Sequence, residues 1–199
     1  MNRISLACPP KRAARRWTTV FVLIALSQAG TIAQGGTPPQ LATDITAADV
    51  QTVIKAPTGG GDRQMRVVDM GKYNVSVGVL RRGPTKAGAP VGAINHEHVT
   101  EVYYVISGSG TLLTDDIVDG AKPLPADGEI VKIAVGPSNQ GTFRQAAQTR
   151  KVGAGDIVII PPGVYHGFTD VADHVEYVSV RPDPDHVLPA GYVHPLLKK

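Results

Sequence analysis

Two segments of this chain carry side chains that could hold a metal ion. Residues 96–101 (HEHVTE) lead into the apolar run 102–108, and residues 155–166 (GDIVIIPPGVYH) end in a histidine. Three imidazoles and one carboxylate form a plausible ligand set for a divalent transition metal such as Fe, Mn, Ni, Cu or Zn. The candidate ligands are His96, His98, Glu101 and His166.

The second segment has the pattern of a strand, a turn and another strand. Residues 157–160 are all apolar, which predicts a strand buried on both faces. Pro161, Pro162 and Gly163 follow, and this combination favours a tight turn. His166 and Phe168 are two residues apart, so they should share one face of the next strand.

In the first segment, the spacing of the candidate ligands is irregular for a strand. His96 and His98 would share one face of a regular strand, whereas Glu101 would lie on the other face with Tyr103. A bulge near residues 99–100 would restore a common face; without it one or both histidines are displaced. We therefore rank His166 and Glu101 as the strongest candidate ligands, followed by His96, with His98 as the weakest.

Both segments resemble the two conserved motifs of the cupin superfamily. The pattern G-x5-P-x-G-x2-H is met at Gly155, Pro161, Gly163 and His166, and H-x-H is followed by Glu101, six residues and Gly108. The chain departs from the family pattern in two places. Asp170 stands where the family has Asn, and two residues instead of three or four separate His98 from Glu101.

The resemblance implies a divalent metal held by His96, His98, Glu101 and His166, with open positions for water, substrate or dioxygen. A bound metal could then act as a Lewis acid or activate O2. The alternative is that these side chains are remnants of a cupin that has lost its metal.

The elements around these segments are short and mostly extended. Residues 46–49 resemble a capping box, so a short helix is predicted up to residue 55. Alternating apolar residues and regular turns then predict an all-β fold, a cupin-type jelly-roll β-barrel with a short N-terminal helix. The expected strands are 65–70, 73–80, 93–106, 110–114, 129–135, 142–145, 157–160, 165–169 and 174–181. Residues 183–199 form a tail that we expect to pack along the outside.

Residues 1–33 are predicted to be a signal peptide, followed by a lead-in and short helix at 34–60 and the cupin domain at 61–199. A basic region precedes the short apolar core 20–26 and then small residues. This core is shorter than a membrane span, which favours a cleaved signal over an uncleaved anchor. We therefore expect a periplasmic or secreted protein.

Cleavage would change the formal charge of the chain from +3 to −2, because five basic and no acidic residues leave. A chain near neutrality gives no reason to propose nucleic acid or membrane as a partner of the mature form. The single cysteine, Cys8, would also leave, so neither a disulfide nor a thiol nucleophile is expected.

Four further residues are candidates for contacts with a substrate. Tyr103 should lie on the same strand face as Glu101. Arg66 and Arg81 could hold an anionic group, and Phe168 could line the pocket wall. For these residues core packing or solvent exposure is the competing interpretation. The same applies to His174, His186 and His194, which lie outside the two motifs.

These observations predict a metal-binding cupin that acts on a small organic molecule, with a dioxygenase-type oxidoreductase as the first expectation. Glu101 could leave the metal and act as a base, which makes it the candidate catalytic residue. One alternative is a cupin that binds a metal or small ligand without turnover, and another is an isomerase or lyase. Family analogy also suggests a homodimer.

Overall fold

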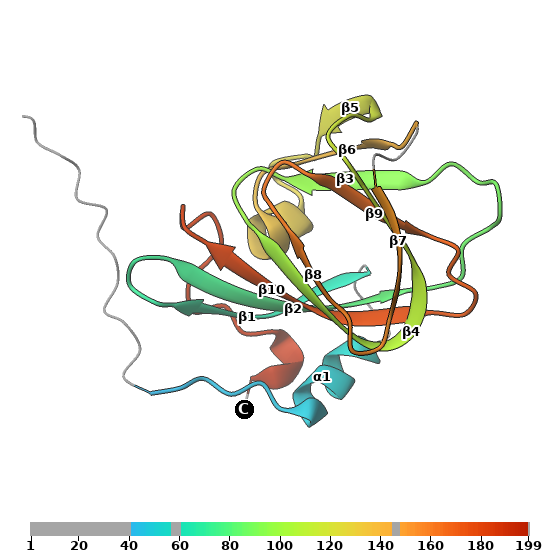
Figure 1. Cartoon of the computed structure of the whole chain (residues 1–199). Helices are drawn as coiled ribbons and strands as arrows, with labels where there is room; N and C mark the ends of the chain where they lie inside the picture. Colours follow the sequence, from blue (N-terminus) through green and yellow to red (C-terminus); the bar gives the residue numbers. More distant parts are fainter. Residues whose placement is uncertain (1–40, 57–60, 145–147, 199) are drawn as a thin grey trace, which may run out of the picture. The chain divides into compact units, whose positions relative to one another are not determined.

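The computed structural model describes residues 41–56, 61–144 and 148–198 (Figure 1). The predicted signal peptide, residues 1–33, lies outside the described residues. Within the described residues, no helix is both long enough and apolar enough to cross a membrane.

Ten strands and three short helices make up the described part of the chain. In chain order they are α1 (Ala47–Ile54), β1 (Asp62–Asp69), β2 (Asn74–Arg82), β3 (Gly92–His96), β4 (Glu101–Asp115), β5 (Asp119–Pro123), the π-helix η1 (Val131–Val135), β6 (Ser138–Thr142), β7 (Gln148–Gly153), β8 (Ile157–Ile160), β9 (Tyr165–Thr169), β10 (Val175–Asp183) and the 3₁₀ helix η2 (Pro195–Leu197).

All strand pairs are antiparallel, and the long strand β4 joins two sheets. Its first half pairs with β8 and β10, and β2 and β1 continue that sheet beyond β10. Its second half pairs with β7 and β9, and β3, β6 and β5 continue the second sheet beyond β9. Figure 1 shows the two sheets curling toward each other around β4. This arrangement confirms the predicted all-β jelly-roll class.

The passage of β4 from one sheet to the other occurs near Gly108. Gly108 has a φ of 70°, a left-handed conformation that favours glycine. A Cβ at this position would lie 2.0 Å from the carbonyl oxygen of His174. Only glycine fits here, which gives a physical reason for the glycine that ends the first motif.

An outer layer covers part of the first sheet. Thr46 and Asp49 form the predicted capping box at the start of α1. Val53 and Ile54 of this helix pack with Met65, Val79 and Leu197, which come from β1, β2 and the C-terminal tail. As predicted, the tail therefore packs on the outside of the barrel, where Leu188 and Leu197 are buried.

Several strand predictions were wrong. Residues 97–100 interrupt the strand expected at 93–106, β4 runs through 110–114 without a break, and β5 and β7 were not foreseen. The strand expected at 129–135 is the π-helix η1 instead. Its buried residues Val131, Ala134 and Val135 have helical spacing, so burial of one helical face outweighs the β propensity of valine and isoleucine.

The strand β8 is present at 157–160 but is not buried on both faces. Val158 and Ile160 are buried, whereas Ile157 and Ile159 are 65% and 66% exposed. The four apolar residues therefore alternate between the barrel interior and the outer surface.

This alternation predicts that alanine substitution at two adjacent isoleucines has very different effects on the free energy of unfolding. Ile160→Ala should lower the free energy of unfolding by about 2–5 kcal/mol, because it leaves a cavity in the core. Ile159→Ala should change it by no more than about 0.5 kcal/mol. Denaturant unfolding followed by circular dichroism measures both, and equal losses would contradict the placement of β8.

Candidate metal centre

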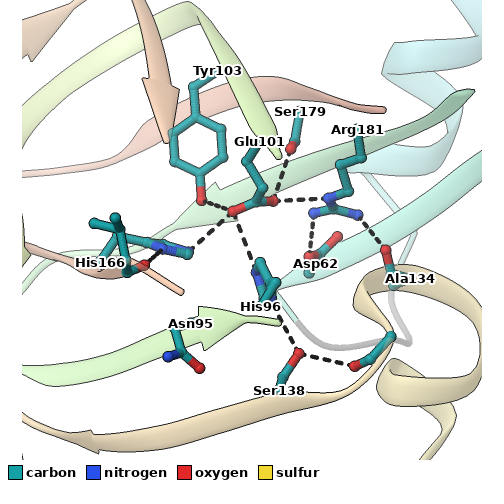
Figure 2. Close-up of polar contacts among 12 residues, drawn as sticks. Asp62, Asn95, His96, Glu101, Tyr103, Ala134, Ser138, His166, Ser179 and Arg181 are labelled. Carbon is teal, nitrogen blue, oxygen red and sulfur yellow. Dashed lines mark hydrogen bonds and ion pairs between the residues drawn. The ribbon is translucent and has the colours of Figure 1, made fainter. Parts of the chain in front are cut away.

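Three of the predicted ligands converge in the barrel interior (Figure 2). His96 ends β3, Glu101 begins β4 and His166 lies on β9. Glu101 Oε2 lies 3.3 Å from His96 Nε2 and 3.0 Å from His166 Nε2. The three side chains are buried, and one ligand atom from each lies within 4.8 Å of the others. The described residues thus contain a compact His/Glu/His cluster.

Backbone contacts fix the two histidines relative to each other. His166 is close to β3 because β9 pairs with β3 through Ile94. The turn that contains Gly163 also binds the end of β3: Gly163 N donates to His96 O at 2.8 Å, and Asn95 Nδ2 donates to Gly163 O at 3.0 Å. The proline–glycine turn of the second motif therefore holds the end of β3, which belongs to the first motif, in place.

The structure does not bring His98 to this cluster. Residues 97–100 leave the strand, and Glu97 N donates to Pro137 O. His98 is partly exposed, with its Nδ1 2.7 Å from Asp185 Oδ2. Because the chain turns between His96 and Glu101, the alternation of a continuous strand does not apply, and His96 and Glu101 reach the same site without a strand bulge.

Hydrogen bonds assign the tautomers of both clustered histidines. His166 Nδ1 lies 3.1 Å from the carbonyl oxygen of Val164, which can only accept a hydrogen bond. His96 Nδ1 lies 2.8 Å from Ser138 Oγ, and this hydroxyl donates its own hydrogen to Gly136 O. Each Nδ1 therefore carries the hydrogen. In the neutral imidazoles, both Nε2 lone pairs face the carboxylate of Glu101.

Glu101 is ionised although it is buried. Burial alone would raise its pKa, but the charge of the Arg181 guanidinium outweighs burial and holds the pKa well below its ordinary value of 4.5. Burial also lowers the pKa of His96, despite the opposing attraction of Glu101. At neutral pH the site thus combines a carboxylate with a neutral His96, the protonation states that a metal ion requires.

The remaining hydrogen-bonding capacity of Glu101 is filled by three protein groups. Oε1 accepts hydrogen bonds from Ser179 Oγ and Arg181 Nε, each at 2.8 Å. Oε2 accepts one from the hydroxyl of Tyr103 at 2.6 Å. Only Oε2 faces the histidines, so Glu101 can offer a single oxygen to an ion held between them.

Arg181 is the central residue that sequence analysis missed. Its side chain is fully buried and also contacts Asp62, Gln64 Oε1 and the carbonyl oxygen of Ala134 in η1. Two carboxylates, Glu101 and Asp62, thus share one guanidinium. A lone arginine near the end of a predicted strand gives no signal of this role.

A cavity of about 890 Å³ opens onto the cluster. Its walls include His96, Glu101 and His166 together with predicted substrate contacts Tyr103 and Phe168. Arg81 borders the cavity, but its guanidinium pairs with Glu176 and is largely exposed. Arg66 is not among the lining residues in the described part; its backbone pairs with Val193 of the tail.

The other three histidines lie apart from this cluster. His174 contacts Ser107 and Asp173, and His194 Nδ1 accepts a hydrogen bond from Leu196 N. His186 has a φ of 53° in the segment that follows β10. Their positions agree with the surface and packing roles expected from the sequence.

Comparison with known proteins gives only distant structural similarities. No protein-family model and no curated protein matches the chain. Similar solved structures include a Bacillus halodurans protein, at 16% identity over 80% of this chain and 93% of that one, with a TM-score of 0.46.

Two other similar structures have descriptive names. One is an uncharacterized conserved protein with a double-stranded β-helix domain from Klebsiella pneumoniae, at 20% identity over 72% and 93% of the two chains, with a TM-score of 0.40. The other is an RmlC-like cupin family protein from Methanocaldococcus jannaschii, at 14% identity over 65% and 87%, with a TM-score of 0.36. These TM-scores lie below 0.5, so the fold assignment rests on the strand order of this chain.

The buried ion pair predicts a strong and pH-dependent effect of Arg181→Met. Removal of one partner leaves buried charges unpaired, so the free energy of unfolding should fall by about 3–5 kcal/mol at pH 7. The depressed pKa of Glu101 contributes stability that is present above pH 4.5 and is lost as the pH falls through the folded-state pKa. The difference between wild type and variant should therefore narrow below pH 4.5.

Arg81→Met is the matched control, because Arg81 forms an exposed ion pair with Glu176. It should cost less than about 1 kcal/mol at any pH. Urea unfolding at several pH values compares the two variants, and similar losses would show that the Arg181 network does not stabilise the fold.

Proposed function

We propose that this chain is a metal-binding cupin whose metal centre is formed by His96, Glu101 and His166. The observation that carries the proposal is the convergence of three lone pairs. Both histidines present Nε2 toward Glu101 Oε2, and each has its Nδ1 hydrogen held by an oxygen acceptor. Metal-ligating histidines have this arrangement, in which the second ring nitrogen donates to a carbonyl or another acceptor.

The separation of the donor atoms supports ligation of one ion. Neighbouring ligands of a metal with bonds of about 2.0–2.2 Å lie roughly 3 Å apart. The separations of 3.0 and 3.3 Å between Glu101 Oε2 and the two Nε2 atoms agree with this.

The ligand set favours oxygen chemistry on a small organic molecule. Two histidines and one carboxylate with open positions are the ligands of non-haem Fe(II) oxygenases. A bound metal of this kind would polarise a substrate oxygen or supply a site for O2. We therefore propose a dioxygenase-type oxidoreductase, with the cavity beside the three ligands as the substrate site.

The protein groups around Glu101 favour ligation over proton transfer by this residue. Ser179 and Arg181 hold Oε1, and Tyr103 holds Oε2. These contacts restrain the carboxylate, so it is poorly placed to leave the metal and act as a base. Burial and the charge of Glu101 raise the pKa of Tyr103, so its neutral hydroxyl keeps donating a hydrogen bond to Oε2.

Elemental analysis of purified variants tests the centre. Wild-type protein reconstituted with Fe(II) should retain close to one ion per chain. His166→Ala removes a proposed ligand and should weaken retention more than the roughly 10–100-fold expected from loss of an outer hydrogen bond. His98→Ala is the matched control and should keep the ion, because His98 is paired with Asp185 instead.

Loss of the ion from the His98 variant would contradict this ligand set. No retained ion in wild type, after reconstitution with Fe, Mn, Ni, Cu and Zn in turn, would exclude the metalloenzyme and leave a ligand-binding barrel. Nitric oxide can bind in place of O2 at an Fe(II) ion, so it tests for open positions even though the substrate is not known. If the Fe(II)-loaded protein has open positions, it should give a new high-spin EPR signal with this gas.

A second prediction concerns Ser138, the hydrogen-bond acceptor of His96 Nδ1. Ser138→Ala removes this acceptor without touching a ligand, so metal affinity should fall about 10–100-fold. Competition with a chromogenic chelator measures the affinity. Ser107→Ala is the control, because Ser107 contacts His174 and Glu176 outside the centre. Unchanged affinity in the Ser138 variant would exclude its positioning role.

A further inference from the structure

We propose that Arg82 binds a carboxylate group of the molecule that enters the cavity, which makes the natural ligand a small organic acid. This inference rests on the proposed function in that the bound acid would lie beside the metal centre. Neither Arg82 nor an acidic substrate is assigned by the motifs.

The side chain of Arg82 lies on the inner face of β2. Leu80 and Arg82 are two residues apart, and the buried Leu80 pairs with the buried Tyr177 of β10. Arg82 Nε donates a hydrogen bond to the hydroxyl of Tyr177 at 3.2 Å. Arg82 also lines the same cavity as His96, Glu101 and His166. Strand alternation thus places Arg82 on the inner face of β2 and its neighbour Arg81 on the other face, where the Arg81 guanidinium pairs with Glu176.

Most charged groups around the cavity are already paired. Asp62 pairs with Arg181, Asp119 with Arg144, and Arg81 with Glu176. Arg82, by contrast, has no ion pair within the described residues, although the Asp62 carboxylate that pairs with Arg181 also attracts its charge from a longer distance. Tyr177 does not compensate its charge, because burial raises the pKa of this phenol and keeps its hydroxyl neutral.

The guanidinium of Arg82 is also free to form further hydrogen bonds. Its one hydrogen bond to a described residue uses Nε, so both Nη groups have no protein acceptor in the described part of the chain. A planar guanidinium binds a carboxylate through two parallel hydrogen bonds. A half-buried, unpaired arginine at a cavity wall is therefore a suitable anchor for such a group.

The surface between Arg82 and the metal centre is aromatic. The rings of Phe168 and Tyr177 lie 5.4 Å apart, and those of Tyr177 and Tyr103 lie 4.3 Å apart. The Tyr103 hydroxyl then reaches Glu101. A half-buried guanidinium next to an aromatic wall, with Lys122 exposed at the edge of the same cavity, matches a carboxylate on an apolar or aromatic body. The cavity of about 890 Å³ has room for such a molecule.

Binding of benzoate to the metal-free protein tests this inference, with benzamide as the uncharged analogue. Calorimetry should show that wild type binds benzoate and prefers it to benzamide. Arg82→Gln removes the charge and should weaken benzoate binding at least about tenfold, as expected for a hydrogen bond to a charged group. Arg81→Gln is the matched control and should bind benzoate as wild type does, because Arg81 is paired with Glu176.

Two results would overturn the inference. One is equal benzoate affinity in wild type and Arg82→Gln, and the other is failure of both benzoate and acetate to bind to wild type. Thermal unfolding of each variant first establishes that it is folded. Metal content separates this inference from the proposed metal centre: Arg82→Gln should retain Fe(II) like wild type, whereas His166→Ala should lose it.

Discussion

The buried ion pair between Glu101 and Arg181 is the interaction on which the rest of the structure depends. A fully buried guanidinium is costly unless every donor has an acceptor. Its partners come from separate elements, because Asp62 and Gln64 lie on β1, Glu101 on β4 and Ala134 in η1. One side chain of β10 thus ties together the first strand, the strand that joins both sheets and the π-helix. It also decides which oxygen of Glu101 faces the histidines.

This network makes part of the barrel interior polar and places apolar side chains outside. On β2, Asn74 and Ser76 are buried, whereas Val75 and Val77 are only half-buried on the opposite face. The outer layer of α1 and the tail buries Val79 on that opposite face. Because charged and polar side chains occupy the interior, the protein needs this second apolar layer to bury enough hydrophobic surface.

Local pattern predicted the all-β class, the capped helix, most of the strands and the parity of Tyr103 with Glu101. It could not predict contacts between residues that are far apart in the sequence, such as the ion pair of Arg181 with Asp62. The alternation along β2 is visible in the sequence, but its valine face is the outer one. Arg81 lies on that face and pairs with Glu176, whereas Arg82 lies inward. His98 is a candidate through the H-x-H motif, and its low rank rests on the alternation of a strand through residues 97–100, where the chain in fact turns.

The dispersal of the network along the chain also constrains biosynthesis. Asp62, Glu101 and Arg181 are brought together from the beginning, middle and end of the barrel. A nascent chain that ends before β10 would bury Glu101 without its counter-ion, so the barrel should close only after that strand has left the ribosome. The His/Glu/His cluster would then be completed late, only after the last strand of the barrel has been synthesised.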